Sequence, residues 1–169
     1  MTVKTDALST TYSYEAYPLG TRYVERADEV VAAVHSDGTS LALQGDRTWL
    51  FVRASVALGA YECANQNDVT GSNSRYNVKP TVSDDDASMR VIGVAQTAIA
   101  ITYYGWIVVE GQAVVKASSI TGGEFVVTKG TTAAGNVDNG TTAGTLIGIA
   151  LTTTNSPLTG YCAMDVSIR

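Results

Sequence analysis

The feature that most constrains the fold of this chain is an internal repeat. The segment RVIGVAQTAIAITYYGWIVVE, residues 90–110, aligns with TLIGIALTTTNSPLTGYCAMD, residues 145–165, at a constant offset of 55 residues. A second pair precedes these copies, because VRASVALGAYECA, residues 52–64, aligns with VKASSITGGEFVV, residues 115–127, at an offset of 63. Two pairings in the same order predict two related structural units.

The residue types within the repeats predict β-strands. VRAS and VKAS alternate polar with apolar or small residues, which is typical of a strand with one buried face, and Gly59 and Gly122 suit tight turns that need positive φ. IGVA and IGIA have almost no polar position, as expected for a strand covered on both faces. Gly93 and Gly148 lie inside these strands and predict a β-bulge or a close approach of two backbones.

One stretch, residues 91–109, is long and apolar enough to raise the question of a membrane helix. Glycine, glutamine and threonine interrupt it, and β-branched and aromatic residues dominate it, so we interpret it as two buried strands with a turn between them. The best helix candidate is residues 24–34, although its valines favour a strand almost equally. We therefore predict an all-β chain with at most one short helix.

The repeat also defines the organisation of the chain. We predict an N-terminal arm and connecting segment at 1–44, a first β unit at 45–111 and a second β unit at 112–169, with 45–169 forming one compact domain. A polar, turn-rich loop at 65–88 lengthens the first unit and absorbs the eight-residue difference between the two offsets.

The N-terminal arm has no apolar run that could supply a core of its own. It carries Tyr12, Tyr14 and Tyr17, whose rings offer a large contact area with a polar tip. These tyrosines are candidates for contacts with a neighbouring subunit. A disordered leader and an edge strand on the same barrel are the alternatives. The arm has no basic start, apolar core or cleavage site of a secretory signal, so we expect synthesis in a cytoplasm.

Residues that could carry catalysis are few. The single histidine, His35, lies in a Ser-Asp-Gly turn sequence, and we interpret it as a turn residue and not as part of a hydrolytic triad. Asp84, Asp85 and Asp86 lack the spacing of a calcium loop and read as a solvated acidic loop. The nucleotide-binding and serine-nucleophile motifs GxGxxG after a strand, GxxxxGK[ST] and GxSxG are absent. We therefore predict no enzyme activity, no cofactor and no metal.

The net charge and the cysteine content exclude some classes of partner and of structural site. The net charge of −5 has the wrong sign for a protein that neutralises phosphates, so we expect no nucleic-acid partner. Cys63 and Cys162 are far apart, without a CxxC motif or a Cys/His cluster. We expect two buried free thiols, and neither a zinc site nor a disulfide framework.

The order GDRTWLFVRASVALGAYECA, RVIGVAQTAIAITYYGWIVVEG, VKASSITGGEFVV and GTLIGIALTTT is similar to that in capsid decoration, or cement, proteins of tailed bacteriophages. The resemblance covers Gln44 to Arg169 and leaves the arm uncovered. It implies an all-β, compact β-barrel or tulip-like fold without a catalytic site, assembled as a homotrimer on the outer face of the shell. The residues that carry over are structural glycines: Gly59, Gly93, Gly105, Gly122, Gly148 and Gly160.

The expected function is therefore that of a structural virion protein. It would bind the major capsid protein on the outer capsid surface and cement neighbouring capsomers, with neither nucleic acid nor a membrane as partner. We expect Tyr103, Tyr104 and Trp106 in the core, and contact with a partner chain is the alternative. A receptor- or glycan-binding head of a phage fibre is an alternative that needs Tyr104 and Trp106 exposed at a concave stacking site. A lipoyl-type carrier is another, with Lys129 as the nearest candidate for a modified lysine.

Overall fold

The computed structural model describes residues 8–29, 33–34, 40–41, 45–67, 74–81, 91–117, 120–128, 135–139, 146–153 and 160–167. These residues form twelve strands and one short 3₁₀ helix, which confirms the all-β prediction. In chain order they are β1 (Arg22–Glu25), β2 (Ala33–Val34), β3 (Ser40–Leu41), β4 (Arg47–Ala54), β5 (Cys63–Gln66), η2 (Ser74–Tyr76), β6 (Asn77–Pro80), β7 (Val91–Ala95), β8 (Tyr104–Ala117), β9 (Phe125–Thr128), β10 (Val137–Asn139), β11 (Leu146–Ala150) and β12 (Gly160–Ser167). Among the described residues, no helix has the length and apolar character needed to cross a bilayer.

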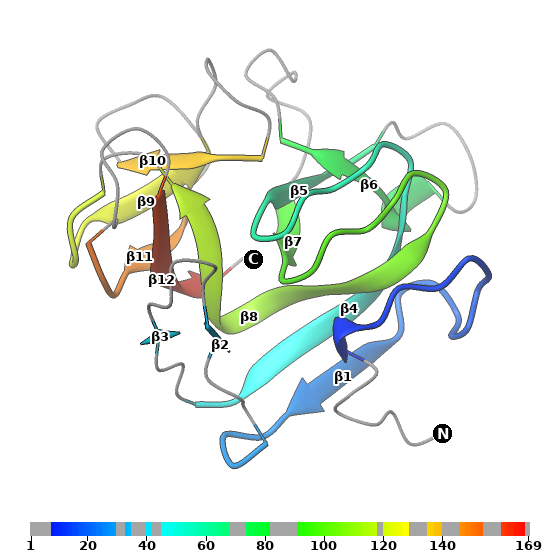
Figure 1. Cartoon of the computed structure of the whole chain (residues 1–169), viewed down its shortest axis with the longest axis horizontal. Coiled ribbons are helices and arrows are strands. Elements are labelled where there is room, and N and C mark those ends of the chain that lie inside the picture. The colour runs from blue at the N-terminus through cyan, green and yellow to red at the C-terminus, as the bar shows by residue number, and fades with distance from the viewer. Residues whose placement is uncertain are drawn as a thin grey trace.

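Ten of these strands belong to one sheet that closes on itself twice (Figure 1). In ring 1, β4 pairs with β6, β6 with β5, β5 with β7, β7 with β8, and β8 returns to β4. In ring 2, β8 pairs with β10, β10 with β9, β9 with β11, β11 with β12, and β12 returns to β8. The sheet is therefore not one simple barrel. It consists of two five-stranded rings that share β8, and the tenth strand, β1, is added at the edge by pairing with β4.

The shared strand, β8, passes from one ring into the other near Gly111. Its first half pairs with β4, and its second half pairs with β12. Gly111 has a φ of +93°, and a Cβ at this position would collide with the carbonyl oxygen of Asp46. Glycine is therefore required at the crossing point both for its backbone angle and for its lack of a side chain.

The two rings repeat the same unusual pairing. Most neighbouring strands are antiparallel, but β4 and β6 run parallel with Ala54 opposite Val78, and β8 and β10 run parallel with Ala117 opposite Val137. Ala54 and Ala117 are the aligned alanines of VRAS and VKAS. The parallel pairs thus occupy corresponding places in the two copies of the repeat.

The glycines inside IGVA and IGIA also occupy corresponding places. The pairing of β5 with β7 is irregular between Ala64 and Asn65, where Ala64 faces Gly93, and that of β9 with β11 is irregular between Leu146 and Gly148. A Cβ on Gly93 would lie 2.7 Å from the carbonyl oxygen of Val108. Each glycine therefore lies at an irregularity of the ladder, and at Gly93 the backbones approach too closely for a side chain.

The positive φ angles expected at Gly59 and Gly122 lie elsewhere, so that prediction was wrong. Tyr61 has a φ of 66° and Gly123 a φ of 90°, two residues and one residue further along the chain. These two positions correspond at an offset of 62, one less than the offset that aligns VRAS with VKAS. The turn after the second copy of this strand is thus one residue shorter.

A glutamate closes each of these turns. The carboxylate of Glu62 accepts a hydrogen bond from the backbone N–H of Gly59 at 2.8 Å, and that of Glu124 accepts one from Thr121 at 2.8 Å. A Cβ on Gly59 would lie 2.8 Å from the Glu62 carboxylate. Glycine is therefore needed at position 59 to leave space for the Glu62 side chain, and not because its backbone has a positive φ.

The candidate helix at residues 24–34 is also not formed where the structure describes it. Arg22–Glu25 is the edge strand β1, which pairs with β4 so that Tyr23 faces Trp49, and Ala33–Val34 is β2. β2 pairs with β3 in a separate two-stranded sheet. The strand preference of the valines and tyrosine prevails, because the ladder on β4 buries one side of β1.

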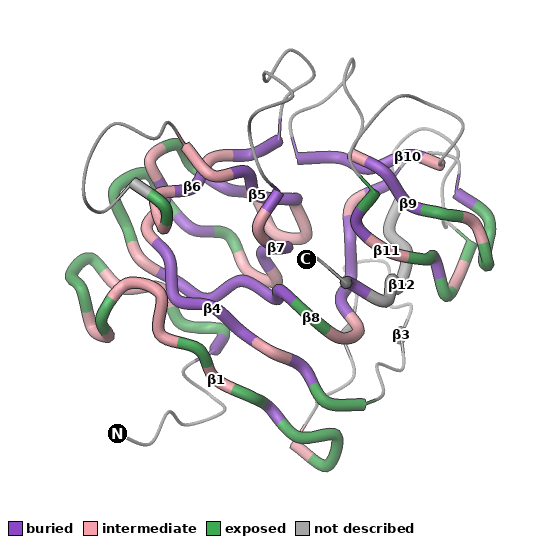
Figure 2. The backbone as a smooth tube through the Cα atoms, turned by 180° about the vertical axis from the view of Figure 1, so that it is seen from behind, coloured by how far each residue is buried: buried purple, intermediate pink, exposed green. Residues whose placement is uncertain are grey.

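Side-chain alternation along β4 and β8 divides the apolar core into two parts. Figure 2 shows the buried stretches of these strands in purple. One part fills ring 1 and comprises Leu50, Val52, Ala54, Leu58, Ala64, Val78, Ala95, Ile99, Ile107 and Val109. The other joins the outside of ring 1 to the inside of ring 2 and includes Phe51, Cys63, Val94, Trp106, Val115, Val126, Val137, Ile147 and Val166. Cys63 is a buried free thiol, as expected, whereas the side chain of Cys162 lies outside the described residues.

Candidate interaction surface

The outer face of ring 1 along β5 and β7 is covered by ring 2. Cys63 and Val94 are fully buried there and Val91 nearly so, in the same cluster as the residues that fill ring 2. The backbone N–H of Cys63 donates to the carbonyl oxygen of Gly135, just before β10, at 2.8 Å. Ring 1 therefore uses this face for a contact between two β rings.

Polar contacts fix the angle of that contact. The side-chain amide of Gln96 donates to the carbonyl oxygen of Val114 at 3.0 Å, and its oxygen accepts from the Val114 N–H at 3.1 Å. Lys116 donates its backbone N–H to Tyr61, and its ammonium lies 3.4 Å from the Glu62 carboxylate. The buried face and these hydrogen bonds together hold ring 1 on ring 2, while the partly exposed ion pair adds little.

The corresponding face of ring 2 is exposed and apolar. Phe125 on β9 lies opposite Ile149 on β11, and their side chains are 61% and 45% exposed. Leu146 and Leu151 extend the same side of β11, whereas Ile147 and Ala150 point inward and are buried. We call the outward set, Phe125, Leu146, Ile149 and Leu151, the ring-2 face.

The pairing register shows that the ring-2 face corresponds to the covered face of ring 1. Phe125 opposite Ile149 occupies the place of Cys63 opposite Val94, on the same side of the same ladder irregularity. In ring 1 these positions are buried by protein, and in ring 2 they face solvent with larger side chains. A contiguous exposed apolar patch of this kind marks an interaction surface.

The N-terminal arm packs on its own chain. Tyr12 and Tyr104 exchange two backbone hydrogen bonds of 2.9 Å. The Tyr17 ring lies 5.2 Å from the rings of both Phe51 and Trp106, between centroids. Tyr14 is instead 66% exposed. Between residues 8 and 20 the described arm forms no strand, and an isolated β-bridge at Tyr12 together with aromatic packing holds it on ring 1. Contact of the exposed Tyr14 with a neighbouring subunit stays a prediction.

The N-terminal arm covers a position on ring 1 that corresponds to the position on ring 2 covered by ring 1. Phe51 donates its N–H to Thr21 and accepts a hydrogen bond from Gly20, both at 2.9 Å. Val114 is the residue that aligns with Phe51 in the repeat, and its N–H and carbonyl are bonded by Gln96. The backbone N–H and carbonyl are thus hydrogen-bonded at both corresponding positions. The arm provides the partners for Phe51 in ring 1, and a residue of ring 1 provides them for Val114 in ring 2.

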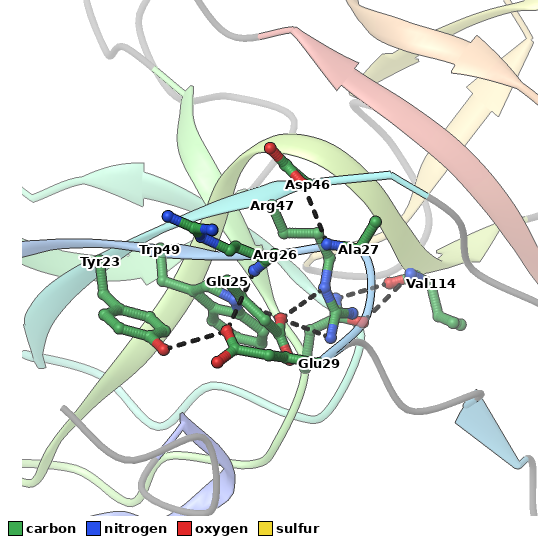
Figure 3. A network of polar contacts seen from close by, with 10 residues as sticks. Tyr23, Glu25, Arg26, Ala27, Glu29, Asp46, Arg47, Trp49 and Val114 are labelled. Carbon is green, nitrogen blue, oxygen red and sulfur yellow. Dashed lines mark hydrogen bonds and ion pairs between the residues drawn. The ribbon is translucent and has the colours of Figure 1, made fainter.

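A buried ion pair anchors β1 on β4 (Figure 3). The Glu25 carboxylate accepts hydrogen bonds from Arg47 Nε and from Trp49 Nε1, both at 2.8 Å, and lies 2.7 Å from a second Arg47 nitrogen. The Arg47 guanidinium also lies 5.0 Å from the Trp49 ring centroid. Both charged side chains are nearly fully buried and paired, which is the condition under which a buried ion pair is tolerated.

The aromatic residues of the β8 entrance divide between core and surface. Trp106 is fully buried, Tyr104 is half-buried with its ring stacked on Phe51 at 6.1 Å, and Tyr103 is 39% exposed. Trp106 therefore cannot be a stacking platform for a glycan, and that part of the fibre-head alternative was wrong. Gly105 precedes it, and a Cβ there would lie 2.8 Å from Ile99 Cδ1, which explains the glycine.

The remaining sequence candidates are placed as follows. Gly122 donates its N–H to Thr153 at 3.2 Å, and Gly160 lies opposite Ala117 at the start of β12. His35, Asp84–Asp86 and Lys129 lie outside the described residues. Within the described residues, no group of three or more histidine, cysteine, aspartate or glutamate side chains is placed to hold a metal ion.

Comparison of the sequence with known protein families and with characterised proteins finds no match. The ring-2 face could not be recognised from the amino-acid sequence. Because IGIA contains no polar residue, its alternation does not show which side is inside the ring. The available signal was the bulky Phe125 in the place of Cys63, which is visible only at the offset of 62.

Proposed function

We propose that the protein is a structural protein of a tailed-phage virion that binds the outer capsid surface and cements neighbouring capsomers. The observation that carries this proposal is the ring-2 face. Its four large apolar side chains are solvent-exposed at positions where the other ring of the same chain makes a protein contact. The resemblance to decoration proteins gives this surface its partner, the major capsid protein.

The chemistry of the surface suits a cementing role. A cement protein needs contact area, shape and avidity, and it needs no reactive group. Removing apolar surface from water contributes roughly 25 cal/mol per Å², so a patch of this kind supplies binding free energy without any charged partner. The net charge of −5 disfavours nonspecific binding to DNA released near the shell. Assembly as a homotrimer would multiply one weak contact into three.

The test is binding to shells prepared without this protein from the phage that encodes it. The wild-type chain is expected to cosediment with the shells and to raise their melting temperature. Phe125→Ser combined with Ile149→Ser should abolish both effects with the circular dichroism spectrum unchanged. Ile101→Ser is the matched control, since Ile101 is 57% exposed but lies in the turn before β8 on ring 1.

Failure of the wild-type chain to bind shells would overturn the cementing role. If the double variant binds shells as well as the wild-type chain does, the ring-2 face is not the surface that binds the capsid. The native mass in solution, measured by light scattering, tests the homotrimer separately. A mass of one chain at micromolar concentration would contradict a preformed trimer.

A further inference from the structure

Ring 1 has a cavity of about 340 Å³ at one open end. Its floor is apolar and consists of Leu50, Ile92 and Val109, of which Leu50 and Val109 belong to the core that fills the ring. The opposite end of this core is closed by Leu58 and Ile99, which are buried and bridge the two turns. The cavity is therefore the mouth of a small β ring, a common position for ligand sites.

The rim of the cavity is cationic. Arg22 reaches it from β1 and Arg75 from η2, and Gln66 and Tyr76 complete the polar lining. Among the residues that the structure describes, no acidic side chain lines the cavity, and neither arginine forms an ion pair. Two guanidinium groups at one concave site, without an acidic partner in the described part of the chain, contrast with the net charge of −5 for the whole chain.

The Tyr76 side of the cavity is held in place by a glycine. Gly20 has a φ of +85°, and a Cβ built on it would lie 2.7 Å from the Tyr76 hydroxyl oxygen and would overlap the ring. Gly20 also donates its N–H to Phe51 of β4. The residues before β1 therefore fix the tyrosine beside the two arginines, although Tyr76 comes from a segment more than 50 residues away in the sequence.

We propose that this cavity binds a small organic anion, specifically a carboxylate carried on an apolar group of several carbon atoms. A guanidinium group matches a carboxylate with two parallel hydrogen bonds, and two such groups at the rim can share one ligand. The apolar floor matches the hydrocarbon part. An inorganic anion would leave this floor in contact with water. The proposal is independent of the capsid-binding role, because it uses a different surface from the ring-2 face.

The test is titration of the protein with octanoate, followed by amide chemical shifts and by calorimetry. Octanol carries the same chain without the charge, and acetate carries the charge without the chain. Octanoate should bind at least about tenfold more tightly than either, since each lacks one of the two matched features. The shifts should be centred on residues 22, 75, 76 and 92, and affinity should fall as salt rises.

Three variants separate the site from general charge effects and from the ring-2 face. Arg22→Gln combined with Arg75→Gln should weaken octanoate binding by about tenfold or more. Arg26→Gln, which removes an exposed arginine outside the cavity, should leave it unchanged. Phe125→Ser should also leave it unchanged. Equal affinity for octanoate and octanol, equal affinity of the double variant and wild type, or shifts away from the cavity would each overturn the proposal.

Discussion

Ile149 in ring 2 and Val94 in ring 1 occupy the same place in two copies of one ladder, yet Val94 is fully buried and Ile149 is 45% exposed. The difference does not arise from the strand itself, because β5 and β9, the neighbours of the two strands, correspond in the repeat and both ladders have an irregularity at the same place. It arises because another ring packs on the face of ring 1 that carries Val94, whereas the corresponding face of ring 2 is exposed. The fold thus contains two corresponding faces: the face of ring 1 is buried in the contact between the rings, and the ring-2 face is exposed to solvent.

The ladder irregularity at Gly148 leaves Ile147 buried inside ring 2 and Ile149 exposed, although they are only two residues apart, and this gives a matched stability test. Ile147→Ala should lower the free energy of unfolding by about 2–5 kcal/mol, because it opens a cavity inside ring 2. Ile149→Ala, two residues away, should change it by less than about 1 kcal/mol. Urea denaturation measures both. A large loss for Ile149→Ala would mean that the ring-2 face is covered by the chain's own residues.

The Glu25 and Arg47 pair should be essential for the docking of β1. Glu25→Gln keeps the shape of the side chain but leaves Arg47 charged and buried, so we expect a loss of about 3–5 kcal/mol in the free energy of unfolding. Glu110→Gln removes the same charge from an exposed side chain with one long hydrogen bond and should cost less than about 0.5 kcal/mol. Similar losses for the two variants would show that the burial of Glu25 has no special role.

The tyrosines of the arm should differ in their effects. Tyr17→Ala removes a ring packed on Phe51 and Trp106 and should cost about 2 kcal/mol, somewhat less than loss of a fully buried aromatic ring. The fluorescence maximum of Trp106 should shift to longer wavelength as water reaches the indole. Tyr14→Ala, at a 66% exposed position, should leave both stability and fluorescence nearly unchanged. Unchanged fluorescence in Tyr17→Ala would contradict packing of the arm on ring 1.

Gly111 and Gly45 allow two reasons for a glycine to be tested separately, namely a positive φ and the lack of space for a Cβ. Both have positive φ, but a Cβ on Gly45 meets nothing within 4 Å, whereas a Cβ on Gly111 collides with the Asp46 carbonyl. Gly45→Ala should therefore cost about 1 kcal/mol from backbone strain alone. Gly111→Ala should cost about 3 kcal/mol or more, since β4 and β8 must move apart. Thermal denaturation of the two variants should rank them in this order, and equal costs would argue against a tight crossing in β8.

The all-β class and the duplicated order of strands could be read from local pattern, because β-branched residues, alternation and the positions of glycines recur in both copies. The structural roles of Gly93 and Gly148 inside strands followed in the same way. These are properties of short segments, and each segment carries its own signal.

Which faces are covered was decided only by the tertiary structure. The strands containing Val94 and Ile149 are both almost wholly apolar, so nothing within either segment distinguishes a buried side from an exposed one. The distinction depends on other segments of the chain, namely the second half of β8 and the residues before β10. The mouth of ring 1 has the same origin, because Arg22 and Arg75 become neighbours only when β1 and η2 are both placed against the closed ring. Contacts between segments distant in sequence have no local signature, and for this reason the two surfaces that carry the proposed functions became visible only in the folded chain.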